Sequence, residues 1–319
     1  MTSLPLRKYF PSASILAYGC MGIGGSWDGT PPDSDTQYRA DAVLDAAIEA
    51  GINVFDHADI YCRGASEAVF GDWMQRRLPD RDSLWIQSKG GICLETDTTG
   101  YQYQLTPSGV RKLVEQSLRR LCIDYLDCWM IHRPDPLVEL GSVADELIRL
   151  REEGKVRHFG ASNMPAFEKR SWEKHLGTLA VIQQEMSLAR LDWLNGVTDF
   201  NTEQSESGAV AELLACSLER GDLQLQAWGS TAQSLWGNKG SQSSNPALVE
   251  LMSVLTERYA CNAQALAIAF VLRHPAAIQP VIGTTRPDRI RECMASTSVK
   301  LTREDWYALY SAARTRPLP

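Results

Sequence analysis

The chain has 319 residues, of which 44% are apolar and 22% charged, and both fractions are typical of a globular protein. This composition excludes collagen-like, low-complexity and strongly disordered chains. The formal net charge of −7 at pH 7 gives no general attraction for a polyanion, so it counts against a nucleic-acid or anionic-membrane partner.

The eight cysteines are scattered, with no C-x-x-C pair and no histidine at zinc-ligand spacing. We therefore expect reduced thiols and no metal site. No apolar run reaches 18 residues, and the first eleven residues lack the apolar stretch of a signal peptide. The sequence thus predicts a cytoplasmic protein.

Short β-type runs recur along the chain, and each is followed by a helical pattern. Several are nearly continuous in apolar residues, which is typical of parallel strands covered on at least one face. Eight strands are predicted at Ser14–Met21, Asn53–Ala58, Leu84–Lys89, Tyr125–His132, His158–Asn163, Val181–Met186, Leu223–Trp228 and Gln279–Thr285.

Helical patterns lie between these strands. One helix over Asp41–Ala50 is expected to end at Gly51, because glycine commonly follows a helix C-terminus. Thr106, followed by proline, supplies an N-cap for a helix with apolar residues at 110, 113, 114, 118 and 121. Val143–Leu150 forms another helix, and Thr302 opens a final one.

Eight strands that alternate with helices, without a Pro/Gly/Ser-rich linker, favour one closed (β/α)8 TIM barrel over two doubly wound domains. We predict this α/β fold as a single domain over residues 1–319, with an extra C-terminal helix. Two polar stretches, Leu188–Ser207 and Ser234–Asn245, follow strands six and seven. They are expected to be elaborated loops at the C-terminal face, where long loops are often functional.

The working residues of barrel enzymes project from the C-terminal ends of strands. Strand two ends near Asp56, with Tyr61 on the next loop, strand three ends in Lys89 and strand four in His132. A lysine there is costly to leave unpaired, so Lys89 should meet Asp56. Its ammonium would lower the pKa of Tyr61 toward neutral pH, and His132 could donate to the same substrate oxygen. The four side chains predict a proton-donating site for a carbonyl group.

Each of these residues also has a simpler explanation. Asp56 and Lys89 could be only a buried pair, His132 a core histidine and Tyr61 a loop tyrosine. A lysine at a barrel strand end is also compatible with Schiff-base chemistry, so a lyase or aldolase using Lys89 remains an alternative.

Several motifs follow one another in a fixed order: Phe55–Tyr61 with Ser66-Glu67, Ser88-Lys89, Asp127 with Ile131–Pro136, Gly154–Asn163 and Val281–Gly283. From Gly19 to about Tyr310 the chain resembles the aldo-keto reductase superfamily, and most closely the bacterial YdhF-like oxidoreductases. The resemblance implies NAD(P)H-dependent interconversion of a small carbonyl compound and its alcohol. It makes Tyr61 the general acid, Lys89 and Asp56 the residues that tune it, and His132 the residue that polarises the carbonyl.

The resemblance also implies the binding site of the nicotinamide cofactor. Ser162, Asn163 and Gln183 would hold the carboxamide, and Trp228 would stack on the ring. The nicotinamide ribose would lie against Gly19, Cys20 and Met21. The phosphate end is expected after strand eight, at Gly283, Thr284, Thr285, Arg286, Arg289 and Glu292.

The two arginines of this last segment bear on the identity of the cofactor. Arg286 or Arg289 could form a fork onto a 2′-phosphate beside a helix N-terminus, so NADP(H) is preferred, with NAD(H) as the alternative. Cys293 stands where the family commonly has asparagine near the adenine. Cys62 replaces a common glycine after Tyr61, and we interpret it as a packed thiol.

The resemblance leaves other questions open. The superfamily also contains nicotinamide-binding regulatory subunits, so a protein with little turnover is a further alternative. Trp27, Trp193 and Trp236 could line an apolar substrate pocket or could be ordinary packing residues. The sequence indicates neither the physiological substrate nor the oligomeric state.

Overall fold

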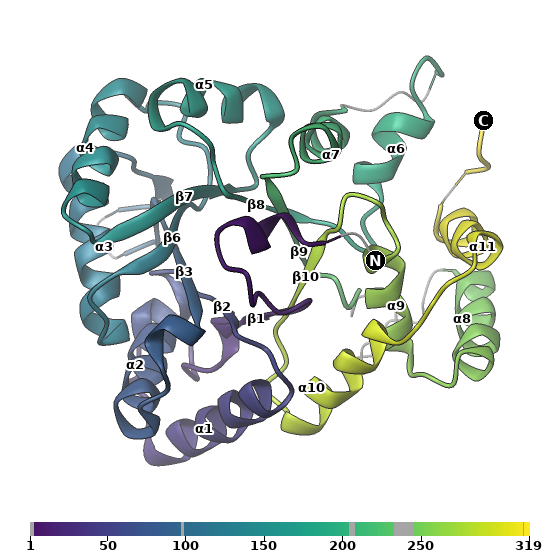
Figure 1. Ribbon diagram of the computed structural model, residues 1–319, viewed down its shortest axis with the longest axis horizontal. Coiled ribbons are helices and arrows are strands. Elements are labelled where there is room, and N and C mark those ends of the chain that lie inside the picture. The colour runs from purple at the N-terminus through teal and green to yellow at the C-terminus, as the bar shows by residue number, and fades with distance from the viewer. Residues whose placement is uncertain (1–2, 97–98, 204–207, 233–244, 315) are drawn as a thin grey trace.

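The computed structural model describes residues 3–96, 99–203, 208–232, 245–314 and 316–319. Its centre is a closed barrel of parallel strands in the spatial order β1-β10-β9-β8-β7-β6-β3-β2 (Figure 1). β1 pairs with both β2 and β10, which closes the barrel. The strands are β1 (Ala17–Gly19), β2 (Val54–Asp56), β3 (Trp85–Gly90), β6 (Leu126–Ile131), β7 (Val156–Ser162), β8 (Val181–Glu185), β9 (Gln224–Trp228) and β10 (Gln279–Ile282).

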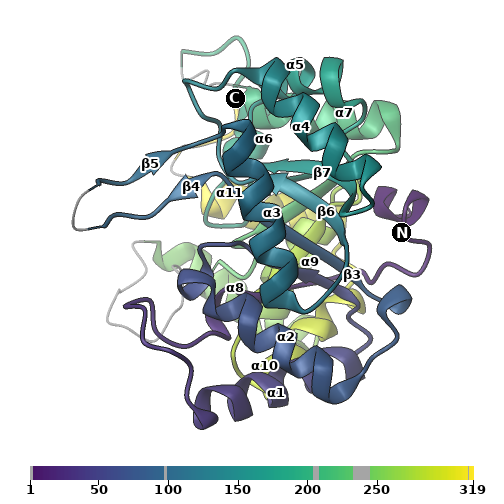
Figure 2. The ribbon, with the colours of Figure 1, turned by 90° about the vertical axis from the view of Figure 1, so that its left-hand side faces the viewer.

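Each barrel strand lies within the corresponding predicted run or, in β3 and β7, extends beyond it by one or two residues. The predicted (β/α)8 barrel is therefore confirmed. Helices surround the strands, as Figures 1 and 2 show. They are α1 (Ser34–Glu49), α2 (Ala65–Arg77), α3 (Pro107–Leu121), α4 (Leu140–Glu152), α5 (Ala166–Leu176), α6 (Asp192–Thr198), α7 (Ala209–Arg220), α8 (Pro246–Arg258), α9 (Ala263–Leu272), α10 (Pro287–Met294) and α11 (Arg303–Ala313).

Short 3-10 turns occur at several connections, at Pro5–Lys8, Cys20–Gly22, Tyr61–Gly64, Arg81–Ser83 and Ala295–Thr297. The first of them lies at the N-terminal end of the barrel. There Leu6 packs with residues near the starts of the strands, including Val54 and Trp85, in a small apolar cluster. The larger apolar cluster fills the space between the strands and the helices.

Local capping explains where the helices begin. Thr106 accepts a hydrogen bond from the Gly109 amide at the start of α3, and Thr302 accepts one from Asp305 at the start of α11, as the sequence predicted. The first helix begins earlier than residue 41, because the Asp33 side chain accepts from the Thr36 amide and caps it there.

The long connections differ from the prediction. Residues 192–198 of the expected loop after β8 form helix α6, where Trp193 is fully buried and its ring lies 5.6 Å from that of His274. Trp193 therefore packs in the protein interior, and it is not among the residues that line the cleft at the C-terminal ends of the strands. Trp236 and most of the 234–245 stretch lie outside the described residues, and Asn245 caps α8.

A two-stranded hairpin was not predicted. β4 (Ile92–Cys93) and β5 (Gln102–Tyr103) form an antiparallel pair that extends away from the barrel in Figure 2. Its strands contain only two residues each, too few to produce a recognisable alternating pattern.

Three further expectations concern the chain as a whole. No helix in the described ranges is long and apolar enough to cross a membrane. The eight cysteines are all free thiols. Within the same ranges, no group of three or more histidine, cysteine or acidic side chains is arranged to hold a metal ion.

The contact between α2 and α3 gives a test of the packing. A methyl group added at Gly71 would lie 2.1 Å from the backbone oxygen of Arg120. We predict that Gly71→Ala lowers the free energy of unfolding by about 1–3 kcal/mol, because the backbone must move apart. Urea unfolding would measure this. Gly141→Ala in α4, where the nearest atom is 4.0 Å away, is the matched control. Equal effects of the two substitutions would contradict the packing described.

Candidate active site

The C-terminal ends of the strands surround a cleft of about 450 Å³. It is lined by residues from seven of the barrel strands or the loops that directly follow them. Ten predicted site residues line it: Gly19, Met21, Asp56, Tyr61, His132, Ser162, Asn163, Gln183, Trp228 and Gly283. The structure thus brings together the two predicted groups, the proton-donating residues and those expected to hold a nicotinamide.

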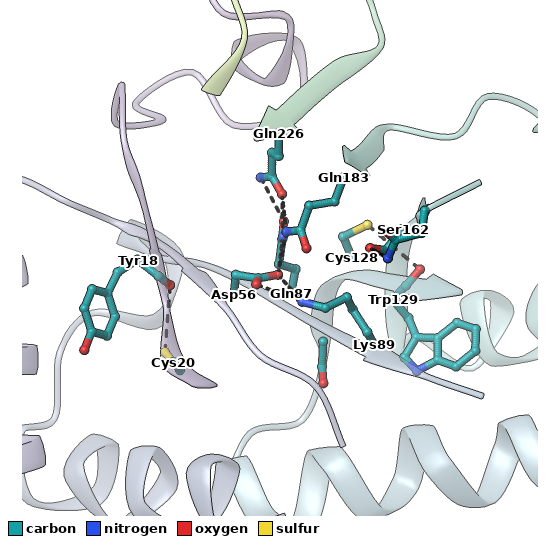
Figure 3. A network of polar contacts seen from close by, with 12 residues as sticks. Tyr18, Cys20, Asp56, Gln87, Lys89, Cys128, Trp129, Ser162, Gln183 and Gln226 are labelled. Carbon is teal, nitrogen blue, oxygen red and sulfur yellow. Dashed lines mark hydrogen bonds and ion pairs between the residues drawn. The ribbon is translucent and has the colours of Figure 1, made fainter. Parts of the chain in front are cut away.

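Asp56 and Lys89 form an ion pair at the base of this cleft (Figure 3). Lys89 Nζ lies 2.7 and 2.8 Å from the two carboxylate oxygens of Asp56, and the side chains are only 1% and 3% exposed. Burial lowers the pKa of Lys89, but the neighbouring Asp56 and Tyr61 raise it by more, so the net shift is upward. The lysine is therefore an ammonium ion at neutral pH, as the predicted pair requires.

Tyr61 begins the turn that follows β2, and Lys89 Nζ lies 5.0 Å from the centre of its ring. Burial raises the pKa of Tyr61 to about 12, although the Lys89 ammonium acts in the opposite direction. The expected fall of this pKa toward neutral pH is therefore wrong for the protein without ligands, because desolvation outweighs the nearby charge. The phenol stays protonated at neutral pH and has a proton to donate.

The turn that carries Tyr61 has an unusual backbone. Cys62 and Arg63 have φ angles of 46° and 55°, which side-chain-bearing residues rarely adopt, and Gly64 follows at 92°. The buried Cys62 thiol donates to the carbonyl oxygens of Met21 and Gly25, at 3.3 and 3.4 Å. These contacts tie the turn to the loop after β1 and agree with the interpretation of Cys62 as packed.

His132 lies across the cleft from this turn. Its ring is edge-on to the ring of Tyr61, with 6.0 Å between the centres, and 9% of the residue is exposed. Burial, with the nearby Lys89 and Arg133 charges, holds the pKa of His132 well below its ordinary value. The imidazole is therefore neutral at pH 7 and carries a single N–H. Its buried Nδ1 has no hydrogen-bond partner among the residues described.

The predicted carboxamide site is held together by its own hydrogen bonds. Trp228 Nε1 donates to Asn163 Oδ1 at 3.2 Å, and Asn163 Nδ2 donates to Ser162 Oγ at 2.9 Å. Asn163 has a φ of 54°, a conformation that asparagine tolerates better than most residues. Gln183 donates its Nε2 to Asp56 Oδ1 at 3.0 Å, which leaves its carbonyl oxygen able to accept from a ligand amide. This donor set fits a nicotinamide.

The other predicted cofactor residues do not line this cleft. Thr284, Thr285, Arg286, Arg289 and Glu292 lie on the loop after β10 and on α10. The guanidinium of Arg286 is paired with Asp288 at the surface.

Two cysteines named in the sequence analysis are buried near the cofactor residues. Cys20, expected beside the cofactor, is completely buried, and its thiol faces the Tyr18 carbonyl oxygen at 3.9 Å. Its side chain therefore does not reach the cleft. Cys293 is also buried, and burial raises the pKa of its thiol to about 12.

Sequence reasoning missed several residues that line the cleft. Ile60, Arg133, Gly229 and Thr231 all lie within four residues of a strand end. Extending the search from the last strand residue to the following loop would have found them. Trp27, named as a candidate, does line the cleft and is 43% exposed.

A second buried polar group lies behind the Tyr61 turn. Glu67 of α2 is completely buried, and it accepts from Ser88 Oγ at 2.5 Å and from Arg120 Nε at 2.8 Å. Asp59 is nearby, and its Oδ1 has no partner in the described chain. Burial and the negative charge of Glu67 raise the pKa of Asp59 to about 7. His57 is buried beside Phe70, and burial lowers its pKa to about 3.

The structure is a closed (β/α)8 barrel with a buried lysine–carboxylate pair, a tyrosine and a histidine at the C-terminal ends of its strands, where the working residues of barrel enzymes lie. The sequence model of the Aldo/keto reductase family matches residues 15–314 of this chain. The chain therefore belongs to the aldo/keto reductase family.

Individual relatives agree with this assignment. Oxidoreductase YdhF of Escherichia coli is 31% identical over 86% of this chain and 88% of its own length. The NADH-specific methylglyoxal reductase of Escherichia coli is 29% identical over 96% of each chain. The solved structure of the glycerol dehydrogenase AKR11B4 from Gluconobacter oxydans has the same fold, with a TM-score of 0.77 and 23% identity over 96% of this chain and 94% of its own.

These comparisons confirm the predicted YdhF-like resemblance. They also confirm the predicted enzyme class, an oxidoreductase that acts on carbonyl groups with a nicotinamide cofactor.

Asp59 gives the site a pH-dependent test. The pKa of Asp59 is higher in the folded protein than in the unfolded chain, so folding favours the neutral carboxyl group. As the pH rises from about 4 through 7 and Asp59 loses its proton, the free energy of unfolding therefore falls. We predict that Asp59→Asn raises the free energy of unfolding at pH 8 by about 1–2 kcal/mol and changes it little at pH 4. Urea unfolding at both pH values measures this difference.

The exposed Asp72, on α2, provides the control. Asp72→Asn should not produce the same gain at pH 8. If Asp59→Asn changed the free energy of unfolding equally little at both pH values, the pKa of Asp59 would not be raised as described.

Proposed function

We propose that the chain reduces a small aldehyde or ketone to the alcohol, and catalyses the reverse reaction, with Tyr61 as the general acid. The observation that carries the proposal is the convergence of Tyr61, His132 and the buried Asp56–Lys89 pair on one cleft. The side chains that fit a nicotinamide carboxamide line the same cleft.

The geometry supports a division of roles among these residues. The single N–H of neutral His132 orients the substrate carbonyl oxygen beside the Tyr61 hydroxyl. Tyr61 then donates its proton to that oxygen as negative charge develops on it. The Lys89 ammonium stabilises the phenolate that remains, and Asp56 holds Lys89 in place. When bound, a reduced nicotinamide supplies the hydride to the carbonyl carbon.

The alternative of a Schiff-base lyase receives less support. A lysine must be neutral to attack a carbonyl, whereas Lys89 is paired with both oxygens of Asp56 and has a raised pKa. Its side chain is also only 1% exposed, beneath the surface of the cleft. A nicotinamide-binding regulatory subunit would show little turnover, so the activity assay described below distinguishes it from a reductase.

We propose NADP(H) as the preferred cofactor, with NAD(H) as the alternative. The carboxamide end would be held by Ser162, Asn163 and Gln183, with the indole of Trp228 against the ring. At the phosphate end Arg289 is the better candidate for a 2′-phosphate, because Arg286 is already paired with Asp288. The NADH specificity in the name of the methylglyoxal reductase relative supports keeping NAD(H) as the alternative.

The substrate proposed is a small carbonyl compound. Beside the reacting groups the cleft is lined by the apolar side chains of Met21, Trp27 and Ile60 and by the cationic Arg133. A short aldehyde with an apolar side or a neighbouring oxygen atom fits these walls. The methylglyoxal named for one relative is a compound of this class.

We also propose a single catalytic domain that acts in the cytoplasm without a nucleic-acid partner. The family match over residues 15–314 supports one domain. Eight reduced cysteines support a reducing compartment, and the net charge of −7 supports the absence of a polyanionic partner.

The test of the function is Tyr61→Phe, which removes only the hydroxyl. We predict that kcat for NADPH-dependent aldehyde reduction falls by roughly 10²–10⁴-fold, the usual contribution of a positioned acid. NADPH binding, followed by the change in nicotinamide fluorescence, should remain nearly intact. NADH is assayed in parallel across a panel of aldehydes, ketones and sugars.

The control is Tyr38→Phe, at an exposed tyrosine of α1. It should leave turnover unchanged. If Tyr61→Phe kept most of the wild-type kcat, the role assigned to Tyr61 would be wrong.

A further inference from the structure

A chain of buried amides lies inside the barrel next to the Asp56–Lys89 pair (Figure 3). Gln87 of β3 and Gln183 of β8 each donate from Nε2 to Asp56 Oδ1, at 2.7 and 3.0 Å. Both amides also donate to Oε1 of Gln226 on β9, at 2.7 and 3.0 Å. Gln87 and Gln226 are completely buried and Gln183 is 2% exposed, so water does not compete for these bonds.

The row of hydrogen-bonded amides continues toward the opposite end of the barrel. Gln226 donates from Nε2 to Oε1 of Gln279 on β10 at 2.9 Å. Gln279 in turn donates from its Nε2 to the backbone carbonyl oxygen of Ser14 at 2.7 Å. The indole N–H of Trp85 donates to Gln87 Oε1 at 3.1 Å. Four amides from four strands therefore form one connected set.

The ends of this set fix the direction of every bond in it. A backbone carbonyl oxygen such as that of Ser14 can only accept, so the amide of Gln279 must turn its nitrogen toward Ser14 and its oxygen toward Gln226. Gln226 must then donate from its nitrogen to Gln279, and it also donates to Gln87 Oε1 at 3.2 Å, while its oxygen accepts from Gln87 and Gln183. Those two amides are left with their nitrogens toward Asp56. Reversing any one amide would place two acceptors or two donors in contact.

We propose that Gln279, Gln226 and Gln87 are positioning residues that keep N–H donors on Asp56 and thereby set the acid strength of Tyr61. The N–H donors take up part of the negative charge of Asp56, so that more of the Lys89 positive charge acts on Tyr61. Gln183 would link the same set to a ligand in the cleft, because it lines the cleft while it bonds to Asp56. The inference rests on the function proposed above for Tyr61.

The charged and titratable groups around Asp56, Lys89 and Tyr61 come from several elements. The direction of the effect follows from two of them, because Asp56 raises the pKa of Tyr61 and Lys89 lowers it. Removing N–H donors from Asp56 should therefore make Tyr61 a weaker acid. The other groups near the three residues are Cys20, His57, Asp59, Cys128 and His132.

The experiment compares two buried glutamines of β9. Gln226→Leu interrupts the amide set. The matched control is Gln224→Leu, because Gln224 is also completely buried on β9. Its amide bonds to the backbone oxygens of Leu225 and Ala277, outside the set that reaches Asp56. Thermal unfolding reports whether each variant folds, and Gln87→Met is a milder interruption should Gln226→Leu fail to fold.

The first readout is the pH profile of kcat for alcohol oxidation, in which Tyr61 must accept a proton. For Gln226→Leu we expect the profile to move to higher pH by about one unit, with a roughly tenfold loss of rate at neutral pH and little change in the KM for the cofactor. Gln224→Leu should keep the wild-type profile. A structural role alone would reduce stability or the overall rate without moving the profile.

The second readout does not depend on turnover. In protein labelled with carbon-13 at tyrosine Cζ, the Tyr61 resonance is assigned by its loss in Tyr61→Phe. We expect it to move in Gln226→Leu and Gln87→Met and to stay in place in Gln224→Leu. If Gln226→Leu and Gln87→Met fold but leave both the Tyr61 resonance and the pH profile unchanged, the inference is overturned. A Tyr61→Phe protein that retained turnover would instead overturn the proposed function, so the two failures are distinguishable.

Discussion

The buried ion pair between Asp56 and Lys89 is the constraint on which the rest of the site depends. Two charges at 3% and 1% exposure are costly to remove from water, and the attraction between them offsets that cost only when other hydrogen bonds also satisfy them. Here Asp56 accepts from Lys89, Gln87 and Gln183. The polar interior of this end of the barrel is therefore a requirement of the pair.

Burial has the largest effect on the pKa values of the neighbouring His132 and Tyr61, and the pair has the next largest. Its ammonium helps to hold the pKa of His132 below the ordinary value, which keeps the imidazole neutral. It opposes the effect of burial on the pKa of Tyr61 without reversing it. At neutral pH the cleft thus presents a neutral phenol and a neutral imidazole beside a fixed positive charge. That combination can donate a proton and then stabilise the phenolate left behind.

Much of this arrangement could be predicted from the sequence. The eight strands are short β-type runs, several of them nearly continuous in apolar residues, and each is followed by a helical pattern. The rule that polar residues at strand ends meet in one place predicted that Asp56, Lys89, His132 and Tyr61 lie together. The direction of the Tyr61 pKa shift could not be predicted, because it depends on how completely the packed protein excludes water. The pairing of Arg286 with Asp288, the burial of Trp193 on α6 and the amide set between β3, β8, β9 and β10 depend equally on three-dimensional contacts.

The most direct test of the central claim is a double-mutant cycle on Asp56→Asn and Lys89→Met, read as kcat for carbonyl reduction. If Asp56 acts through Lys89, each single substitution lowers kcat, and Asp56→Asn costs little more once Lys89 is already methionine. The double variant should therefore lose much less kcat than the product of the two single losses predicts. Additive effects would contradict the account, because they would mean that the two residues act independently.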